Sequence, residues 1–170
     1  VGVYGFLRIV LPIMPEGSQH WQELFIILAV FSILYGSILA FSQDNVRLVV
    51  AYSSIAQLGF IVLGIFALDD KGAQGAVLQM VNHGIVVVAL FLIISVVATR
   101  ADGSESLAEL GGVAFRAPVL AALFLIVTLA TLAMPGSANF VGESLILFGA
   151  FEDKLVYGLL ASIGVVLAAV

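Results

Sequence analysis

The sequence has no cysteine in its 170 residues, and few of the residues carry a charge. Without cysteine the chain cannot form a disulfide, a thiolate zinc site or a cysteine-ligated iron–sulfur cluster. Only 10% of the residues are charged, the formal net charge is −5, and lysine and arginine do not cluster. A basic surface for nucleic acid or for anionic lipid is therefore absent. Nucleic acid is therefore excluded as a partner. Any redox centre that needs cysteine ligands would lie on another chain.

Hydrophobic residues, in contrast, make up 62% of the sequence, and the mean hydropathy is +1.23. A water-soluble domain of this length would not have enough polar side chains to cover its surface. The composition predicts an all-α, polytopic membrane protein in contact with the lipid bilayer. The sequence opens at Val1 without a signal-peptide pattern, and we expect it to be a fragment of a longer chain.

The transmembrane helices are predicted from apolar runs of spanning length, at residues 22–42, 47–67, 75–98 and 155–170. A shorter run at 1–14 is expected to be the end of a helix that begins upstream. Because alternate loops lie on the same side of the membrane, the basic residues divide into Arg47, Arg100 and Arg116 on one face and Lys71 and Lys154 on the other. The excess of basic residues places the arginine face toward the cytoplasm.

Residues 117–151 form an apolar stretch too long for one span, since at 1.5 Å per residue they would reach roughly 52 Å across a hydrocarbon core of about 30 Å. Pro135 and Gly136 lie near its middle. Proline removes a backbone donor, and glycine permits unusual dihedral angles. We expect a broken helix near Pro135, although a proline kink in one packed helix is an alternative.

Glu143 follows the predicted break and has apolar sequence on both sides. A carboxylate at this depth needs water or a partner, and such residues commonly belong to proton pathways. His83 lies within another apolar run, with Gln79 one helical turn earlier and Asn82 beside it. An imidazole can accept a proton on one nitrogen and release one from the other. We therefore interpret Glu143 and His83 as a proton relay.

Structural roles for these two residues remain open from sequence alone. Glu143 could be neutralised by a lysine or bonded to the backbone of the break, and His83 could be hydrogen-bonded to a neighbouring helix. A haem site would need a second well-placed histidine, whereas His20 lies in a linker. Ser53 and Gln57 form a polar stripe on the run at 47–67, suited either to bridging waters or to helix–helix hydrogen bonds.

Three segments carry a resemblance to a known family: residues 51–60 (AYSSIAQLGF), 75–84 (GAVLQMVNHG) and 133–143 (AMPGSANFVGE). Together they resemble the antiporter-like subunits of respiratory complex I, in particular the M type, the counterpart of mitochondrial subunit 4. The likeness covers essentially all 170 residues in order. It implies a fold of about fourteen helices with two inverted five-helix repeats. This chain would be a single membrane domain, residues 1–170, that holds the second repeat preceded by the end of an upstream helix.

The resemblance also implies roles for individual residues. Related L and N subunits usually carry lysine at the position of Glu143, whereas the M type carries this acid as the terminal proton site. The histidine that matches His83 lies on a hydrated central axis. At Gln57 the family commonly has histidine, so the resemblance implies a water-bridging amide at one relay station here. At Arg47 lysine is usual, and we expect a structural or topological role for this arginine.

The function implied is proton translocation by a membrane subunit of NADH:quinone oxidoreductase, with protons leaving on the non-cytoplasmic side. The chain itself would carry no cofactor, because NADH, FMN, iron–sulfur clusters and quinone would bind to partner subunits. The expected location is the bacterial plasma membrane. A subunit of a sodium/proton antiporter complex or of a membrane-bound hydrogenase is the alternative, and a purely scaffolding subunit is a third possibility.

Overall fold

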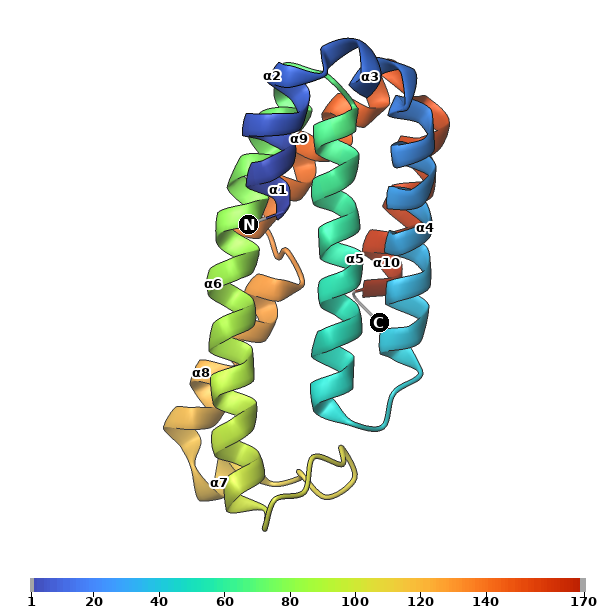
Figure 1. Cartoon of the computed structure of the whole chain (residues 1–170). Helices are drawn as coiled ribbons and strands as arrows, with labels where there is room; N and C mark the ends of the chain where they lie inside the picture. Colours follow the sequence, from blue (N-terminus) through green and yellow to red (C-terminus); the bar gives the residue numbers. More distant parts are fainter. Residues whose placement is uncertain (1, 169–170) are drawn as a thin grey trace.

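The structure is a computed structural model that describes residues 2–168, and its regular elements are helices (Figure 1). The first helices are short: α1 (Gly2–Gly5), the π-helical turn η1 (Phe6–Val10), α2 (Leu11–Ile13) and α3 (Pro15–His20). Three long helices follow: α4 (Gln22–Phe41), α5 (Val46–Phe66) and α6 (Asp70–Arg100). The chain continues through α7 (Val113–Arg116), α8 (Pro118–Thr131), α9 (Ala138–Asp153) and α10 (Leu155–Ala168).

The three long helices are each apolar and long enough to cross a membrane, as the sequence predicts. They lie side by side, α4 against α5 and α5 against α6, with α10 behind α4 and α5 (Figure 1). Side chains in the connecting turns cap the N-termini of α5 and α6. The Asn45 carboxamide accepts hydrogen bonds from the first backbone N–H groups of α5, and the Asp69 carboxylate does the same for α6. These caps set where each span begins.

The break predicted in residues 117–151 is confirmed, because α8 ends at Thr131 and α9 begins at Ala138. Gly136 has a φ of +102°, a conformation that glycine adopts without steric cost. The chain then re-enters a helix at Ser137, whose hydroxyl accepts a hydrogen bond from the Phe140 N–H at 3.2 Å. The alternative of a single kinked helix is therefore wrong.

Apolar side chains divide between a small core and an outer surface. Ile33, Phe60, Phe66 and Ile146 are almost fully buried between the helices. Large apolar side chains also cover the outside of the bundle, among them Phe31, Ile85 and Leu92. Such a surface suits contact with lipid or with other transmembrane helices.

Close contacts between α6 and α9 fix how these two antiparallel helices are aligned. A Cβ added to Gly149 would lie 2.7 Å from the Gly72 nitrogen, and one added to Gly75 would lie 2.8 Å from the Ile146 nitrogen. One added to Gly142 would touch the side chain of Gln79. In each of these three pairs the two residue numbers add up to 221, as expected for two antiparallel helices packed in a single register, with one constant offset. The same offset brings the level of Gln79 to that of Glu143.

Candidate functional site

Glu143 lies in the interior of the bundle on α9 and is 5% exposed. Gln57 on α5 donates a hydrogen bond from Nε2 to Glu143 Oε1 at 2.8 Å. Gln79 on α6 donates from Nε2 to Gln57 Oε1 at 2.8 Å and lies 3.4 Å from Glu143 Oε1. Both amides are also buried. The acid therefore belongs to a three-residue cluster, the Gln57–Gln79–Glu143 cluster, to which three helices each contribute one side chain.

The cluster offers Glu143 neutral hydrogen-bond donors instead of a counter-ion. Within residues 2–168, the ion pairs are Arg47 with Glu105 and Lys71 with Glu152, and neither involves Glu143. Amide N–H groups stabilise a carboxylate by hydrogen bonding without adding a positive charge that would hold it ionised. The sequence-based alternative of a lysine partner thus has no support in the described residues.

His83 lies one turn along α6 from Gln79, and the two residues share a buried face, as the sequence predicts. The ring is 8% exposed, and its Nδ1 has no hydrogen-bond partner among the described residues. The neighbouring Asn82 is only partly buried, although its Nδ2 also has no partner there. In this part of the chain His83 makes no direct hydrogen bond to Glu143. A link between them would need a further group.

Asn139 is a buried polar residue that sequence analysis did not select. It is 2% exposed, and neither its Oδ1 nor its Nδ2 has a hydrogen-bond partner within residues 2–168. It lies one turn before Glu143 on α9, so the two side chains share a helix face. That spacing of four residues is visible in the sequence and could have identified it.

A mainly apolar cavity of about 430 Å³, with a few polar side chains in its lining, lies next to the cluster, between α4, α5, α8 and α10. Gln57 and Ser53 line it, and the Ser53 hydroxyl bonds back to the Val50 carbonyl of its own helix. The cavity extends to Gln43 and Leu107, which lie in the turns at the arginine end of the bundle. Gln57 therefore contacts both this cavity and Glu143.

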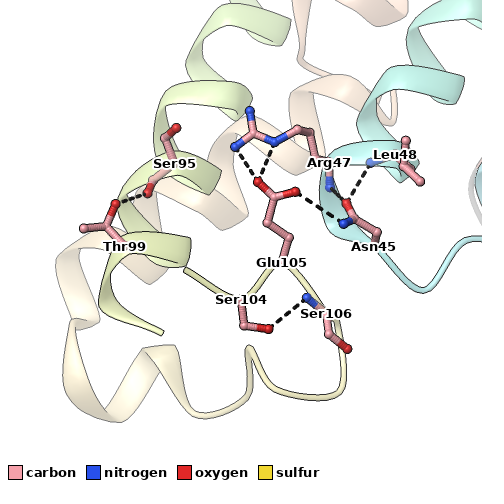
Figure 2. A network of polar contacts seen from close by, with 8 residues as sticks. All are labelled: Asn45, Arg47, Leu48, Ser95, Thr99, Ser104, Glu105 and Ser106. Atoms are coloured by element: carbon pink, nitrogen blue, oxygen red, sulfur yellow. Dashed lines mark hydrogen bonds and ion pairs between the residues drawn. The ribbon is translucent and has the colours of Figure 1, made fainter. Parts of the chain in front are cut away.

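Arg47 has a structural contact at that same end (Figure 2). Its guanidinium group pairs with Glu105 in the segment after α6, at 2.5 Å from Nη2 and 2.6 Å from Nε. Asn45 Nδ2 also donates to Glu105, and the Val46 N–H donates to the Glu105 carbonyl. The hydrogen bond and charge of Arg47 hold the pKa of the Glu105 carboxyl below its ordinary value of 4.5. This ion pair ties the segment 101–112 to the start of α5.

Pro135 and Gly136 lie in the exposed turn between α8 and α9 and make no contribution to the cluster among the described residues. Their effect is geometric, because the turn starts α9 at the level where Asn139 and Glu143 face α6.

Comparisons with known proteins agree with the resemblance in the motifs. A family model described as "NADH:quinone oxidoreductase/Mrp antiporter, TM" matches residues 1–168. The chain belongs to this family. A relative named NADH-quinone oxidoreductase subunit M, from Rickettsia bellii, is 40% identical over 170 residues, which are 100% of this chain and 34% of the relative. The chain therefore spans about a third of the length of such relatives, and the predicted M-type resemblance is confirmed.

Solved structures that the chain resembles have the same fold. A chain of respiratory complex I from Thermus thermophilus with bound NADH matches with a TM-score of 0.94 and 34% identity, over 99% of this chain and 36% of that one. A chain of the membrane-bound sulfane sulfur reductase, an archaeal respiratory membrane complex, matches with a TM-score of 0.91 and 27% identity, over 99% and 35% respectively. The predicted all-α fold of a multi-pass membrane protein is confirmed.

Proposed function

We propose that this chain is part of a proton-translocating membrane subunit of a bacterial NADH:quinone oxidoreductase. The observation that carries the proposal is Glu143, a buried carboxyl group held by two neutral amides, one of which, Gln57, also lines a cavity. An ionisable group inside a membrane bundle is costly, and such residues commonly mark ion or proton pathways. The relatives named as subunit M support the choice of complex.

In this proposal protons arrive from the arginine end of the bundle. Water in the cavity would carry them as far as Gln57, which orients the Glu143 carboxyl toward the arriving proton. An amide does not carry a net charge, so Gln57 positions the acid while the proton passes through water. His83 lies nearer the arginine end of α6 than Gln79 does, so it passes the proton on to Glu143, which accepts it last. Release occurs on the lysine side of the membrane, which is the non-cytoplasmic side.

The chain supplies the proton path and no electron carrier. We propose that NADH, FMN, iron–sulfur clusters and quinone bind to partner subunits, and that redox energy reaches Glu143 through changes in charge pairing between neighbouring membrane subunits. The partners of this chain are then those subunits, lipid, protons and water. In this proposal residues 1–170 belong to a single membrane domain, the second five-helix repeat preceded by the end of an upstream helix.

Replacing Glu143 by glutamine in the full-length subunit tests the proposal, since glutamine keeps the shape and loses the ionisable carboxyl group. Loss of proton pumping in the assembled complex is the expected result. The second candidate is an antiporter complex, which is favoured by the part of the family description that names the Mrp antiporter. Sodium-dependent proton transport that needs no NADH would support that candidate instead.

A further inference from the structure

The relay just proposed contains a gap between His83 and Glu143, since the described residues provide no hydrogen bond between them. The alignment of α6 and α9 shows what lies in this gap. Gly72 meets Gly149, Gly75 meets Ile146, and Gln79 meets Gly142. One further turn along α6 is His83, and the constant offset places it opposite Ala138, next to Asn139.

Asn139 and His83 are therefore buried at the same level of one helix–helix contact. Each has polar atoms that lack a partner among residues 2–168, namely Nδ1 of His83 and both amide atoms of Asn139. Gln79 Oε1 on the same face of α6 also lacks one there. Buried polar groups without hydrogen-bond partners are rare and cost free energy. An apolar residue would fill the position of Asn139 without that cost if its role were packing alone.

The partner of Asn139 must come from within this contact. The residue is 2% exposed, so the helices of this chain already separate its amide from the surroundings. The groups that the offset places near it are Asn82 directly opposite on α6, the His83 ring beside Asn82, the Glu143 carboxyl one turn along α9, and a small molecule such as water admitted to the contact. A carboxamide has two donors and an acceptor, so it can bond to a histidine and a carboxylate in either protonation state.

We propose that Asn139 is a positioning residue of the proton relay, which holds the hydrogen-bonded link between His83 and Glu143 either directly or through one water. This proposal rests on the proposed function of Glu143. Asn139 does not itself take up the proton. Its amide rotates to donate to whichever neighbour is the acceptor, and so keeps the imidazole and the carboxyl in line for transfer.

Asn139→Leu and Asn139→Ser in the full-length subunit distinguish this role from packing. Leucine has a similar size but no hydrogen-bonding group, whereas serine is smaller and keeps a donor and an acceptor. A positioning role predicts that NADH-driven pumping falls roughly tenfold in the leucine variant, the equivalent of one lost hydrogen bond, and stays higher in the serine variant. A packing role predicts the reverse order, because leucine fills the site and removes an unpaired polar group.

The measurement is proton uptake into vesicles per NADH oxidised, with equal amounts of assembled complex. Asn139→Leu should also add little to His83→Gln in the double variant, because both changes interrupt one link. Ser18→Ala is the matched control, since Ser18 is another buried polar residue but lies on α3 and bonds to the Met14 carbonyl. If the leucine variant does not assemble, Asn139→Ala replaces it, and serine must then exceed alanine.

Pumping by Asn139→Leu at the native level, or equal pumping by the serine and alanine variants, would overturn this inference. Glu143→Gln in the same membranes keeps the two proposals apart. If Glu143→Gln is impaired while the Asn139 variants are not, only the role of Asn139 fails. If Glu143→Gln pumps fully, the proposed function fails, and the inference fails with it.

Discussion

Gln57 donates a hydrogen bond to Glu143 although the two residues lie 86 positions apart in the sequence. This contact joins α5 to the half-helix α9, and it brings the wall of the cavity to the one acidic side chain in the interior of the described bundle. Whatever water occupies the cavity is thus one amide away from Glu143.

The first prediction concerns this amide. Gln57→Leu should lower NADH-driven proton pumping about tenfold, because the carboxyl of Glu143 loses a buried hydrogen bond and its orientation. Gln57→His keeps a ring N–H donor and should retain more activity. Pumping is compared at equal amounts of assembled complex. Equal loss in both variants would show that the donor at position 57 has no special role.

The second prediction concerns the close approach of α6 and α9. Gly75→Ala should reduce the amount of assembled complex, since the new Cβ would lie 2.8 Å from the backbone of Gly142 and Ile146. Alanine normally favours a helix by about 1 kcal/mol over glycine, but overpacking typically costs about 1–3 kcal/mol. The helix-propensity gain is therefore outweighed.

Gly84→Ala is the matched control for that change. It lies on the same helix and has open space around its Cβ position, so only the propensity gain applies. Thermal inactivation of the two variants gives the comparison. Equal stability of the two variants would contradict the helix alignment on which the His83–Asn139 pairing depends.

Much of the fold could be predicted from the sequence, because apolar runs and turn formers are local signals. The spans at 22–42, 47–67 and 75–98 correspond to α4, α5 and α6 within a few residues. The break was predictable because Pro135 and Gly136 interrupt a run that is too long for one span. Hydropathy cannot show which faces of the helices meet, since lipid-facing and buried apolar residues look alike.

The same limit applies to the candidate site. Glu143, Gln79 and His83 were selected as polar residues in apolar runs, and all three are buried. The contact of Gln57 with Glu143 depends on how α5 packs beside α9, and a local sequence pattern cannot predict that packing. Asn139 was passed over because it lies close to the break that was predicted near Pro135. Its burial follows from α9 beginning at Ala138.

The third prediction concerns the ion pair of Arg47 with Glu105. Arg47→Met should speed hydrogen exchange at the Val46 and Leu107 N–H groups, which bond across the contact between the segment 101–112 and the start of α5. The pKa of Glu105 lies below its ordinary value of 4.5. The ion pair therefore stabilises this contact fully above pH 4.5. Protection should therefore fall as the pH drops through the lowered pKa.

Glu105→Gln should show lowered protection of these N–H groups at every pH, without the further fall at acid pH. Exchange mass spectrometry on the detergent-solubilised complex makes this measurement. Unchanged protection in Arg47→Met would mean that the backbone bonds alone hold the segment in place.

The most direct test of the account compares Glu143→Gln and Glu143→Asp in the full-length subunit. Membrane potential formation and NADH-driven quinone reduction are measured in membranes that contain equal amounts of assembled complex. We predict that both variants assemble, that glutamine abolishes most of the pumping, and that aspartate, which keeps an exchangeable carboxyl, retains clearly more. Full pumping by the glutamine variant would contradict the role assigned to Glu143.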